Sequence, residues 1–459
     1  MPATPPLTLE ALTTAVDSGA IDTVLVTFTD VQGRLQGKRL HARYFLEEAV
    51  HHGAEGCNYL LAVDVDMNTV GGYEMSSWER GYGDFLLEPD LSTLRLATWL
   101  PATALVQCDL LWLDHAPVRQ SPRQILKDQV RRAAEMGYTA FAGTELEFIL
   151  FDTTYEEAWD RNYRGLTPSN RYNVDYSILG TTRVEPVLRD IRNHMHAAGM
   201  VVESAKGECN FGQHEVAFKY ADVVTTADQH SVYKNAAKEI AAQHGKALTF
   251  IAKYDEREGN SCHIHLSLRG TDGRTVFATE PDGSPSPDGR SAVFGSFVAG
   301  ILATLREFTL LYAPNINSYK RYQSGSFAPT TIAWGEDNRT CAVRVVGHGP
   351  SLRMENRTPG GDVNPYIAIA GMLAGGLWGI ERGLELEPPY VGNAYLSDDR
   401  SRVPVTLREA RELFASSEVA REAFGEDVVA HYVNAADVEI AAYDAAVTDW
   451  ELRRGFERL

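Results

Sequence analysis

Four short stretches of the chain alternate polar and apolar residues in the way that half-buried strands do. They are GTELEFIL around Glu145 and Glu147, GECNFGQHEVAF around Glu208 and Glu215, CHIHLSL around His263 and His265, and LRMENRT around Glu355 and Arg357. Side chains two residues apart on a strand share one face, so three of the stretches each point a polar pair in one direction. In the remaining stretch the two glutamates stand seven residues apart, and a hairpin that turns at Gly212 would bring them together. The apolar residues between the polar ones are expected to pack in the core.

The first hundred residues predict a small α+β unit. We expect a helix over residues 9–18, a strand over residues 21–28 and, after a polar turn, a second strand. Further on, Ser121-Pro122-Arg123-Gln124 predicts a helix that opens with a capping box, and Gly137 ends it. We place a boundary near residue 116, which gives an N-terminal domain of residues 1–116 and a second domain of residues 117–459.

The rest of the chain mixes helices and strands without a repeat. Residues 227–244 fit a helix, and residues 270–289, rich in Gly, Asp, Pro and Ser, are expected to form an exposed loop. The longest apolar run, residues 367–380, is too short to span a bilayer, which takes ~20 residues. Asn364-Pro365 precedes it as N-cap and first helical residue, so it predicts a buried helix. Two helices are expected to end the chain, the first opened by a capping box of Thr406 and Glu409.

The composition is typical of a soluble globular protein, with 44% hydrophobic and 23% charged residues among 459. The formal net charge of -19 argues against nucleic acid as a partner, because phosphate binding requires a basic surface. The five cysteines are odd in number and contain no C-x-x-C pair, which favours a reducing compartment. The segment MPATPPLTLE lacks the basic and apolar regions of a signal peptide. These features predict a cytoplasmic protein that binds neither nucleic acid nor a membrane.

The acidic residues on the predicted strands indicate a metal site, because carboxylates crowded on one sheet face repel unless cations lie between them. Hard divalent cations such as Mg²⁺ or Mn²⁺ prefer oxygen ligands, and Mn²⁺ tolerates a single imidazole best. Five carboxylates and one histidine suffice for two such ions: Glu145, Glu147, Glu208, Glu215, His263 and Glu355. The alternative is a set of surface strands whose acids face water, and four such stretches in one chain make that interpretation the weaker one.

Arginines near the same strands favour phosphoryl transfer. Arg339, Arg344 and Arg357 fall on or beside the strands that hold the acids, and Arg321 lies in NINSYKRYQSGSFAP. Arginine forks bind carboxylate and phosphate, and with divalent ions they neutralise the charge on a moving phosphoryl group. On residue type alone, Arg353 is better explained as part of a structural ion pair. The chain contains neither G-x-x-x-x-G-K-[ST] nor G-x-G-x-x-G, so a nucleotide would be held in another way.

Seven ordered segments form a larger signature. They are G-Y-G-D-F-L-L-E-P-D-L-S-T-L-R, G-T-E-L-E-F, E-C-N-F-G-Q-H-E, E-G-N-S-C-H-I-H-L-S, N-S-Y-K-R, N-R-x-x-x-x-R and E-N-R-x-P-x-x-x-x-N-P-Y. In order and spacing they resemble the glutamine synthetase family. The resemblance implies an α+β fold with a small N-terminal β-grasp-like domain and a catalytic domain built on a curved antiparallel sheet. It also implies a homododecamer of two stacked hexameric rings, with active sites between neighbouring subunits.

The resemblance assigns roles by motif position. It implies that one metal ion is bound by Glu147, Glu208 and Glu215, and the other by Glu145, His263 and Glu355. The residues implied to bind glutamate and the phosphate formed from it are Gly259, Arg321, Arg339 and Arg357, of which Arg321 and Arg339 are the candidate catalytic residues. Those implied to surround ATP are Glu203, His265, Ser267, Arg344 and Arg353.

The chain departs from the family in the loop after N-S-Y-K-R. Members that use ammonia carry a glutamate just before the A-P dipeptide, where this chain has Phe327. The F-D-G-S-S motif has no clear counterpart, which leaves Asp64 and Asp66 as candidates for the acidic contact and for the base. Ammonium needs anionic partners to leave water, whereas Phe327 would line a roomier pocket for the stem of an organic amine. We therefore expect an amine pocket of Phe327, Asp64 and Asp66; the alternative is a neutral packing substitution.

Other departures are smaller. Tyr254 replaces a proline, and Glu258 and Ser261 replace small residues of the nucleotide signature, while the alternation that supports ATP binding is kept. Tyr395 lies near the position where some members carry an adenylylated tyrosine, and we interpret it as an ordinary loop residue.

Together these features predict an ATP-dependent ligase that joins the γ-carboxylate of L-glutamate to a primary amine through γ-glutamyl phosphate. Ethanolamine is the favoured amine, because E-S-A-K-G-E-C-N resembles ethanolamine-using members most. The alternatives are a γ-glutamylpolyamine synthetase acting on putrescine, cadaverine, spermidine or spermine, an ammonia-dependent glutamine synthetase, and a non-catalytic sensor that binds glutamate and metal. A two-metal hydrolase is less favoured, since nothing resembles an activated nucleophile.

Overall fold

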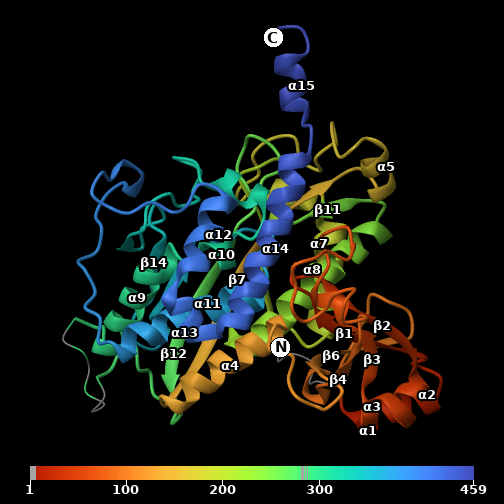
Figure 1. Ribbon diagram of the computed structural model, residues 1–459. Coiled ribbons are helices and arrows are strands. Elements are labelled where there is room, and N and C mark those ends of the chain that lie inside the picture. Colours follow the sequence, from red (N-terminus) through yellow and green to blue (C-terminus); the bar gives the residue numbers. More distant parts are fainter. Residues whose placement is uncertain (1–6, 281–283, 285, 287) are drawn as a thin grey trace.

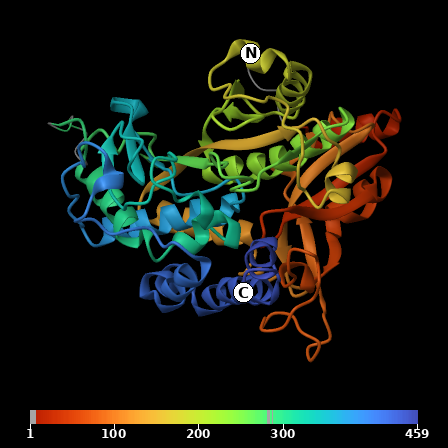
Figure 2. The same ribbon diagram turned by 90° about the horizontal axis from the view of Figure 1, so that it is seen from above.

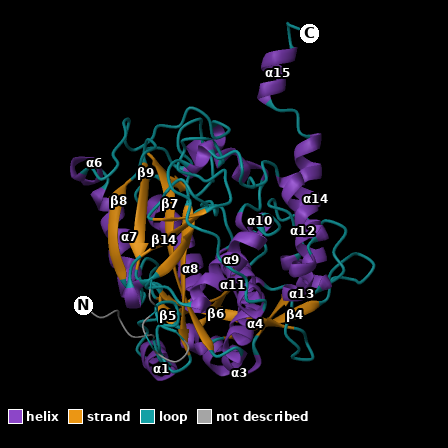
Figure 3. Ribbon diagram, turned by 90° about the vertical axis from the view of Figure 1, so that its left-hand side faces the viewer, coloured by secondary structure: helices purple, strands orange, loops and turns teal. Residues whose placement is uncertain are grey.

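The computed structural model describes residues 7–280, 284, 286 and 288–459. Two sheets with helices packed around them make up the chain, so the α+β prediction is confirmed. Figure 1 shows the N-terminal strands, in red and orange, beside the longer strands of the second sheet, and Figure 2 shows the same arrangement from above. The last helix, α15 (Asp449–Gly455), extends away from the body of the chain (Figure 3).

The first sheet lies within the N-terminal residues. Its strands are β1 (Thr23–Thr29), β2 (Leu35–His41), β3 (Ala54–Cys57), β4 (Asp84–Pro89), β5 (Arg95–Leu96) and β6 (Thr103–Leu111). They follow the order β2-β1-β6-β4-β3, with β5 paired to β6; β1 and β6 run parallel and the other pairs are antiparallel. The helices of this part are α1 (Leu9–Asp17), α2 (Ala42–Tyr44) and α3 (Val50–His52). Both α1 and β1 lie close to their predicted positions.

The second sheet carries all four polar stretches. Its strands are β7 (Tyr138–Phe151), β8 (Val202–Gly207), β9 (Gln213–Phe218), β10 (Ala221–Asp222), β11 (Ala247–Thr249), β12 (Cys262–Gly270), β13 (Trp334–Glu336), β14 (Val343–Val346) and β15 (Arg353–Asn356). They follow the order β13-β14-β15-β12-β7-β9-β8, with β10 and β11 paired to β7, and only β13 and β14 run parallel. Leu146, Phe148 and Ile264 are buried, as the alternation predicts.

The helices between β6 and α15 include those that pack against this sheet. They are α4 (Pro122–Glu135), α5 (Tyr155–Asp160), α6 (Ile178–Thr182), α7 (Glu185–Ala197), α8 (Val223–Gln243), α9 (Ala292–Leu305), α10 (Thr309–Tyr312), α11 (Pro365–Glu381), α12 (Leu407–Ser416), α13 (Glu418–Phe424) and α14 (Glu426–Ala445). α4 and α8 contact β7, α11 contacts α4 and α8, and α9 contacts α11. The apolar residues behind the polar face of the sheet therefore have a helical layer to pack against.

Glycines let α9 and α11 approach closely. A Cβ added at Gly300 would lie 2.2 Å from the carbonyl oxygen of Gly375, and one added at Gly379 would lie 2.2 Å from that of Ser296. Any side chain at these two positions would push the helices apart. This contact explains Gly379 in the apolar run predicted to form a buried helix. That prediction is confirmed, with Asn364 as N-cap accepting from the backbone N–H of Tyr366 at 3.2 Å.

Several local predictions were wrong. Ser121 holds the N-cap position of α4 but its hydroxyl makes no cap hydrogen bond, and Gln124 donates to Asp128 at 2.9 Å, so no capping box forms there. Thr406 caps α12 by accepting from the Glu409 N–H at 3.1 Å, but the Glu409 carboxylate accepts from a different residue, so this box is half formed.

The C-terminal helices also differ from the two expected. Within the described residues the segment after residue 406 forms α12, α13, α14 and α15. Ser417 separates α12 from α13 by capping the second helix, since its hydroxyl accepts from the Ala420 N–H at 3.0 Å. Gly425, with a φ of 87°, then separates α13 from α14. Earlier in the chain, α8 starts before its predicted position because Asp222 caps it, accepting from the Thr225 N–H at 3.0 Å.

The remaining predictions concern loops and boundaries. Of the predicted loop over residues 270–289, residues 281–283, 285 and 287 lie outside the described residues. The predicted domain boundary near residue 116 falls between β6 and α4 and stays a prediction. All five cysteines are free. None of the helices among the described residues combines the length and apolar character that a bilayer crossing requires.

Candidate metal and nucleotide site

Three carboxylates from the middle of the second sheet meet in one place. Glu147 on β7 and Glu215 on β9 are direct cross-strand partners. Glu208 joins them because the β8–β9 hairpin turns at Gly212, whose φ is 71°, and the Glu208 N–H donates to the Gln213 carbonyl at 2.9 Å. One oxygen of each carboxylate lies within 4.8 Å of the others. The hairpin predicted from the spacing of the glutamates is confirmed.

This first carboxylate group is electrostatically crowded. Burial, opposed by Lys206 and helped by the nearby acids Glu145 and Glu147, raises the pKa of Glu215 to about 8. Glu147 is fixed in the cluster by the Ser261 N–H, which donates to it at 2.7 Å. Crowded carboxylates of this kind are suited to a divalent cation, which takes oxygen ligands.

A second group lies next to the first and contains both histidines. One ligand atom each of Glu145, His265 and Glu355 lie within 4.8 Å of one another. His263 also belongs here, because its Nδ1 lies 3.3 Å from Glu145 Oε2 and 3.5 Å from Glu355 Oε1. The Nε2 atom of His263 is buried and has no hydrogen-bond partner in the described part of the chain. A buried imidazole whose Nδ1 lies beside two carboxylates fits a second divalent ion.

Two arginines hold Glu355 in place. Arg357 Nη1 lies 2.5 Å from Glu355 Oε1, and Arg344 Nη1 lies 2.8 Å from Glu355 Oε2. Burial disfavours the charged form of Glu355, but the neighbouring His263 and Arg357 outweigh it and lower the pKa of this carboxyl. Glu355 therefore remains an anion although its side chain is fully buried.

A cavity of about 510 Å³ opens beside the second group. Its volume falls in the range of small-molecule sites, which run from about 300 to 1,000 Å³. Four of the five residues predicted to surround ATP line it, together with Glu145: Glu203, His265, Ser267 and Arg353. Arg353 Nε donates to His265 Nδ1 at 3.2 Å, which leaves Nε2 of the same ring directed to Glu145 at 2.9 Å. Arg344 is not among the residues that line this cavity, and contacts Glu355 instead.

Of the predicted glutamate-binding residues, Gly259 lies against Arg321. Arg321 lies in the 3₁₀ helix Ile316–Arg321 and is 1% exposed. It donates to the Thr358 carbonyl at 2.9 Å and to the Ser261 hydroxyl at 2.8 Å. A Cβ added at Gly259 would lie 2.6 Å from Arg321 Cγ and 2.3 Å from the Ala252 carbonyl oxygen, so only glycine fits there. Ser261, a departure from the family signature, is thus a direct partner of Arg321.

Arg339 and Phe327 occupy more exposed positions. The guanidinium of Arg339 lies 3.8 Å from Asp337, which also binds Arg344, and Arg339 itself is exposed. Phe327 is 54% exposed and has a φ of 59°, a left-handed backbone conformation that costs a non-glycine residue energy. Its carbonyl accepts from Arg357 Nη2 at 3.4 Å, which ties this loop to the second group.

Residues 119–455 match the family described as glutamine synthetase, catalytic domain. The chain belongs to the glutamine synthetase family. It is 64% identical over 456 residues to the γ-glutamylethanolamide synthetase GlnA4 of Streptomyces coelicolor, covering 99% of this chain and 97% of that relative. It is 38% identical over 443 residues to the glutamate–isopropylamine ligase of a Pseudomonas species, covering 96% of each chain.

The solved structures agree with this assignment. An ADP complex of GmaS superposes with a TM-score of 0.84 and 27% identity, covering 97% of this chain and 99% of that one. GmaS without ligand gives the same TM-score and identity. The predicted class, an ATP-dependent glutamate–amine ligase of the glutamine synthetase family, is confirmed. Enzymes of this family use ATP and divalent metal ions.

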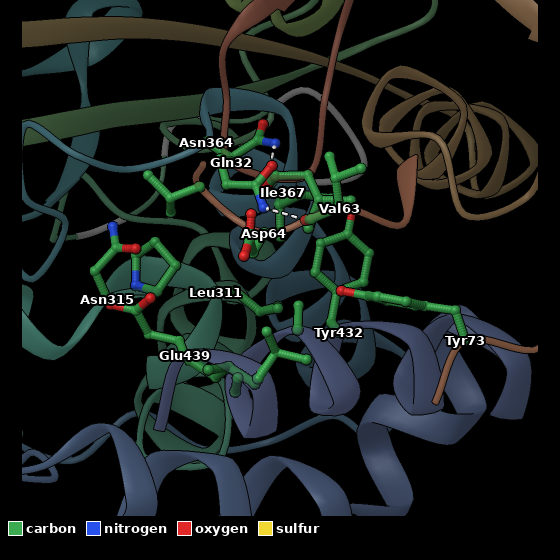
Figure 4. Close-up of a pocket in the computed structure, with 17 residues that line it drawn as sticks. Gln32, Val63, Asp64, Tyr73, Leu311, Asn315, Asn364, Ile367, Tyr432 and Glu439 are labelled. Atoms are coloured by element: carbon green, nitrogen blue, oxygen red, sulfur yellow. Dashed lines mark hydrogen bonds between the residues drawn. The ribbon is translucent and has the colours of Figure 1, made fainter. Parts of the chain in front are cut away.

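The structure does not assemble the predicted amine pocket within one chain. Asp64 lines a separate cavity of only about 60 Å³ with Tyr73, Tyr432 and Glu439 (Figure 4). Its carboxylate accepts from the backbone N–H of Asn68 at 2.8 Å, so it closes a local turn. Neither Phe327 nor the two carboxylate groups line this cavity. The cavity is largely apolar, and its volume is too small for glutamate or ATP. Asp66 is exposed beside it.

Sequence reasoning missed two residues of the site. Tyr395 donates its hydroxyl to the Ala328 carbonyl at 3.0 Å and so holds the loop that carries Phe327. Lys206 places its ammonium against Glu208 and lies 3.7 Å from Glu215. The signal for Lys206 was its place two residues before Glu208, near the end of a strand, where the two side chains point the same way.

Proposed function

We propose that the acceptor amine is ethanolamine, so that the product is γ-glutamylethanolamide. The 64% identity with GlnA4 across 99% of the chain carries this proposal. Phe327 supports it, because a phenyl ring offers no anion to draw ammonium from water but can contact the stem of an organic amine. The relative named for isopropylamine also takes a small organic amine.

Glutamate would bind to Gly259, Arg321, Arg339 and Arg357. The Nε atoms of Arg321 and Arg357 are buried without a hydrogen-bond partner in the described part of the chain, so each can still donate. The backbone of Gly259 lies against Arg321 and allows a ligand to approach closely. Arg339 is exposed, so its side chain can leave Asp337 and turn toward a phosphate formed at the γ-carboxylate.

ATP would occupy the 510 Å³ cavity, with Glu203, His265, Ser267 and Arg353 around it. Its phosphates would point to the end of the cavity where Glu145 lies, because the carboxylate groups and Arg344 are at that end. Arg344 then stabilises the negative charge that moves from ATP to glutamate.

Mg²⁺ or Mn²⁺ would be held at one position by Glu147, Glu208 and Glu215 and at another by Glu145, His263 and Glu355. When bound, such ions would neutralise the phosphate oxygens and orient them. The chain's own part is to place the acids: β7 supplies one ligand to each group, and Arg344 and Arg357 keep Glu355 charged and fixed.

The ligation itself needs a neutral amine. Its nitrogen forms a bond to the γ-carbon of γ-glutamyl phosphate, the C–O bond to phosphate breaks, and the amine loses a proton to a base. Asp64 and Asp66 remain our proposed bases, and since Asp64 lies away from Phe327 in its own chain, they would act on the site of a neighbouring subunit. This requires the ring assembly of the family, for which we propose a dodecamer of two hexameric rings. A cytoplasmic location is supported by the five free cysteines.

A single assay tests the function. Phosphate release is measured with Mg²⁺, ATP and glutamate across ammonium, ethanolamine, isopropylamine, putrescine, cadaverine, spermidine and spermine. The proposal expects ethanolamine to give the highest kcat/KM. A higher kcat/KM with a polyamine or with ammonium would show that ethanolamine is not the acceptor. If no amine gave phosphate release, the proposed ligase activity would be refuted.

A further inference from the structure

Lys206 occupies an unusual place in the first carboxylate group, defined above as Glu147, Glu208 and Glu215. It lies on β8, which pairs with β9, and its register partner across the ladder is Glu215. Its ammonium contacts Glu208 and lies 3.7 Å from Glu215 Oε2. Two of the three carboxylates proposed to bind one divalent ion therefore already share a cation that belongs to the chain.

The ammonium of Lys206 also has a second neighbour. Its Nζ lies 5.1 Å from the centre of the Tyr176 ring, within the distance at which a cation is attracted to an aromatic face. Tyr176 is 73% exposed, so its ring borders solvent. The side chain of Lys206 thus contacts an exposed ring in addition to the carboxylates, and it can keep that contact when it leaves them.

We propose that Lys206 is a built-in substitute cation, which holds Glu208 and Glu215 together before a metal ion binds and is displaced by that ion toward Tyr176. The carboxylate oxygens of this group lie within 4.8 Å of one another, so an ion bound among them takes over a contact that Lys206 makes. Two cations so close together repel. Displacement of the ammonium then opposes metal binding, while its presence without metal relieves the repulsion between the acids.

The experiment uses the full-length chain and its Lys206→Met variant, which keeps the length of the side chain and removes its charge. Calorimetric titration with Mn²⁺ alone gives the dissociation constants, and melting temperatures are recorded with EDTA and with saturating Mn²⁺. We expect the variant to bind Mn²⁺ about tenfold more tightly at one class of site, equivalent to about 1.4 kcal/mol. We also expect it to melt earlier than wild type in EDTA but not in Mn²⁺.

A matched control is Lys246→Met, because Lys246 also contacts a carboxylate, that of Asp152, and its side chain is 27% exposed against 23% for Lys206. It should leave Mn²⁺ binding unchanged. The role of Lys206 would be overturned if Lys206→Met bound Mn²⁺ with unchanged or lower affinity. It would also be overturned if the variant lost the same melting temperature with and without metal, which would indicate a merely structural side chain.

A measurement on wild type covers the case in which Lys206→Met does not fold. Reductive methylation followed by peptide mass spectrometry reports how accessible each lysine ammonium is. We expect methylation of Lys206 to rise when Mn²⁺ is added, with Lys246 as internal reference, and an equal or lower rate would refute displacement. The inference rests on the proposed metal site. Failure of wild type to bind Mn²⁺ would refute that site itself, whereas wild-type binding that the variant does not strengthen refutes only the role of Lys206.

Discussion

Glu145 Oε1 lies 2.9 Å from Nε2 of His265, and this contact joins the second group, which also contains Glu355, to the cavity of about 510 Å³. The resemblance to the glutamine synthetase family implies different tasks for the two residues, metal binding for Glu145 and ATP binding for His265. In the structure each belongs to both places, because β7 and β12 are paired and set Glu145 and His265 on the same face of the sheet. The cavity and the second group are therefore one continuous site.

Replacing Glu145 should weaken both the reaction rate and the binding of the metal ion. We expect Glu145→Gln to lower phosphate release with ethanolamine at least about 100-fold, since it removes an anionic ligand of the metal ion proposed to neutralise the reacting phosphates. It should also raise the Mg²⁺ concentration needed for half-maximal rate. The matched control is Glu156→Gln, at an exposed position in the first turn of α5. Loss of activity without a change in the Mg²⁺ requirement would separate Glu145 from metal binding.

Phe327 should determine the choice between ammonium and organic amines. We expect Phe327→Glu to raise the ratio of ammonium to ethanolamine kcat/KM by about tenfold, which corresponds to about 1.4 kcal/mol, because a carboxylate gives ammonium the partner that a phenyl ring lacks. Phe327→Leu controls for loss of the ring without added charge and should leave ammonium use low. An unchanged ratio in Phe327→Glu would contradict our account of the amine pocket.

Tyr395 should act through the loop that carries Phe327. Its hydroxyl donates to the Ala328 carbonyl at 3.0 Å, and removal of such a hydrogen bond costs about 1 kcal/mol. We expect Tyr395→Phe to raise the KM for ethanolamine about fivefold, with the KM for ATP unchanged. Tyr443→Phe, at an exposed tyrosine of α14, is the control. Equal effects on both KM values would show that Tyr395 supports the fold rather than the amine loop.

The strands, and which of their side chains share a face, were predictable from the sequence. The contacts of several side chains were not. Alternation set Glu145 with Glu147 and His263 with His265, since a strand fixes which side chains share a face. It could not show that His265 reaches Glu145, because strand order and register come from pairings between distant segments. The exposure of Arg339 and the separate cavity of Asp64 were hidden for the same reason.

Sequence motifs gave wrong predictions where a side chain had a second hydrogen-bond or ion-pair partner within reach. The motif at Ser121 has the residues of a capping box, yet Gln124 donates to Asp128 one helical turn later. Lys206 was visible in the sequence, but a lysine near glutamates is usually a solvated surface residue. Only the hairpin geometry places it between two carboxylates.

The stability of the chain should fall at mildly acidic pH through His431. This residue lies on α14, is buried, and its ring lies 4.6 Å from that of Tyr73, between centroids. Burial lowers the pKa of His431 to about 4, against a usual value of 6.5. Below pH 6.5 His431 therefore takes up a proton in the unfolded chain but stays neutral in the folded chain. The stability that neutral His431 contributes is complete above pH 6.5 and is lost as the pH falls toward 4.

The size of this effect can be measured against a variant. Between pH 7 and pH 5 the shift corresponds to about 2 kcal/mol in the free energy of unfolding. We expect His431→Gln to lose less stability than wild type over that interval by about this amount, as measured by urea unfolding at both pH values. Parallel losses in the two proteins would show that His431 does not remain neutral when folded.

The central claim is that Glu145, Glu147, Glu208, Glu215, His263 and Glu355 bind two divalent ions. It is tested most directly by an anomalous difference map from crystals of the protein soaked with Mn²⁺. The account predicts two peaks in each chain, one among the oxygens of Glu147, Glu208 and Glu215 and one between His263 and the carboxylates of Glu145 and Glu355. A map without a peak at either place, from crystals that hold Mn²⁺ elsewhere, would contradict it.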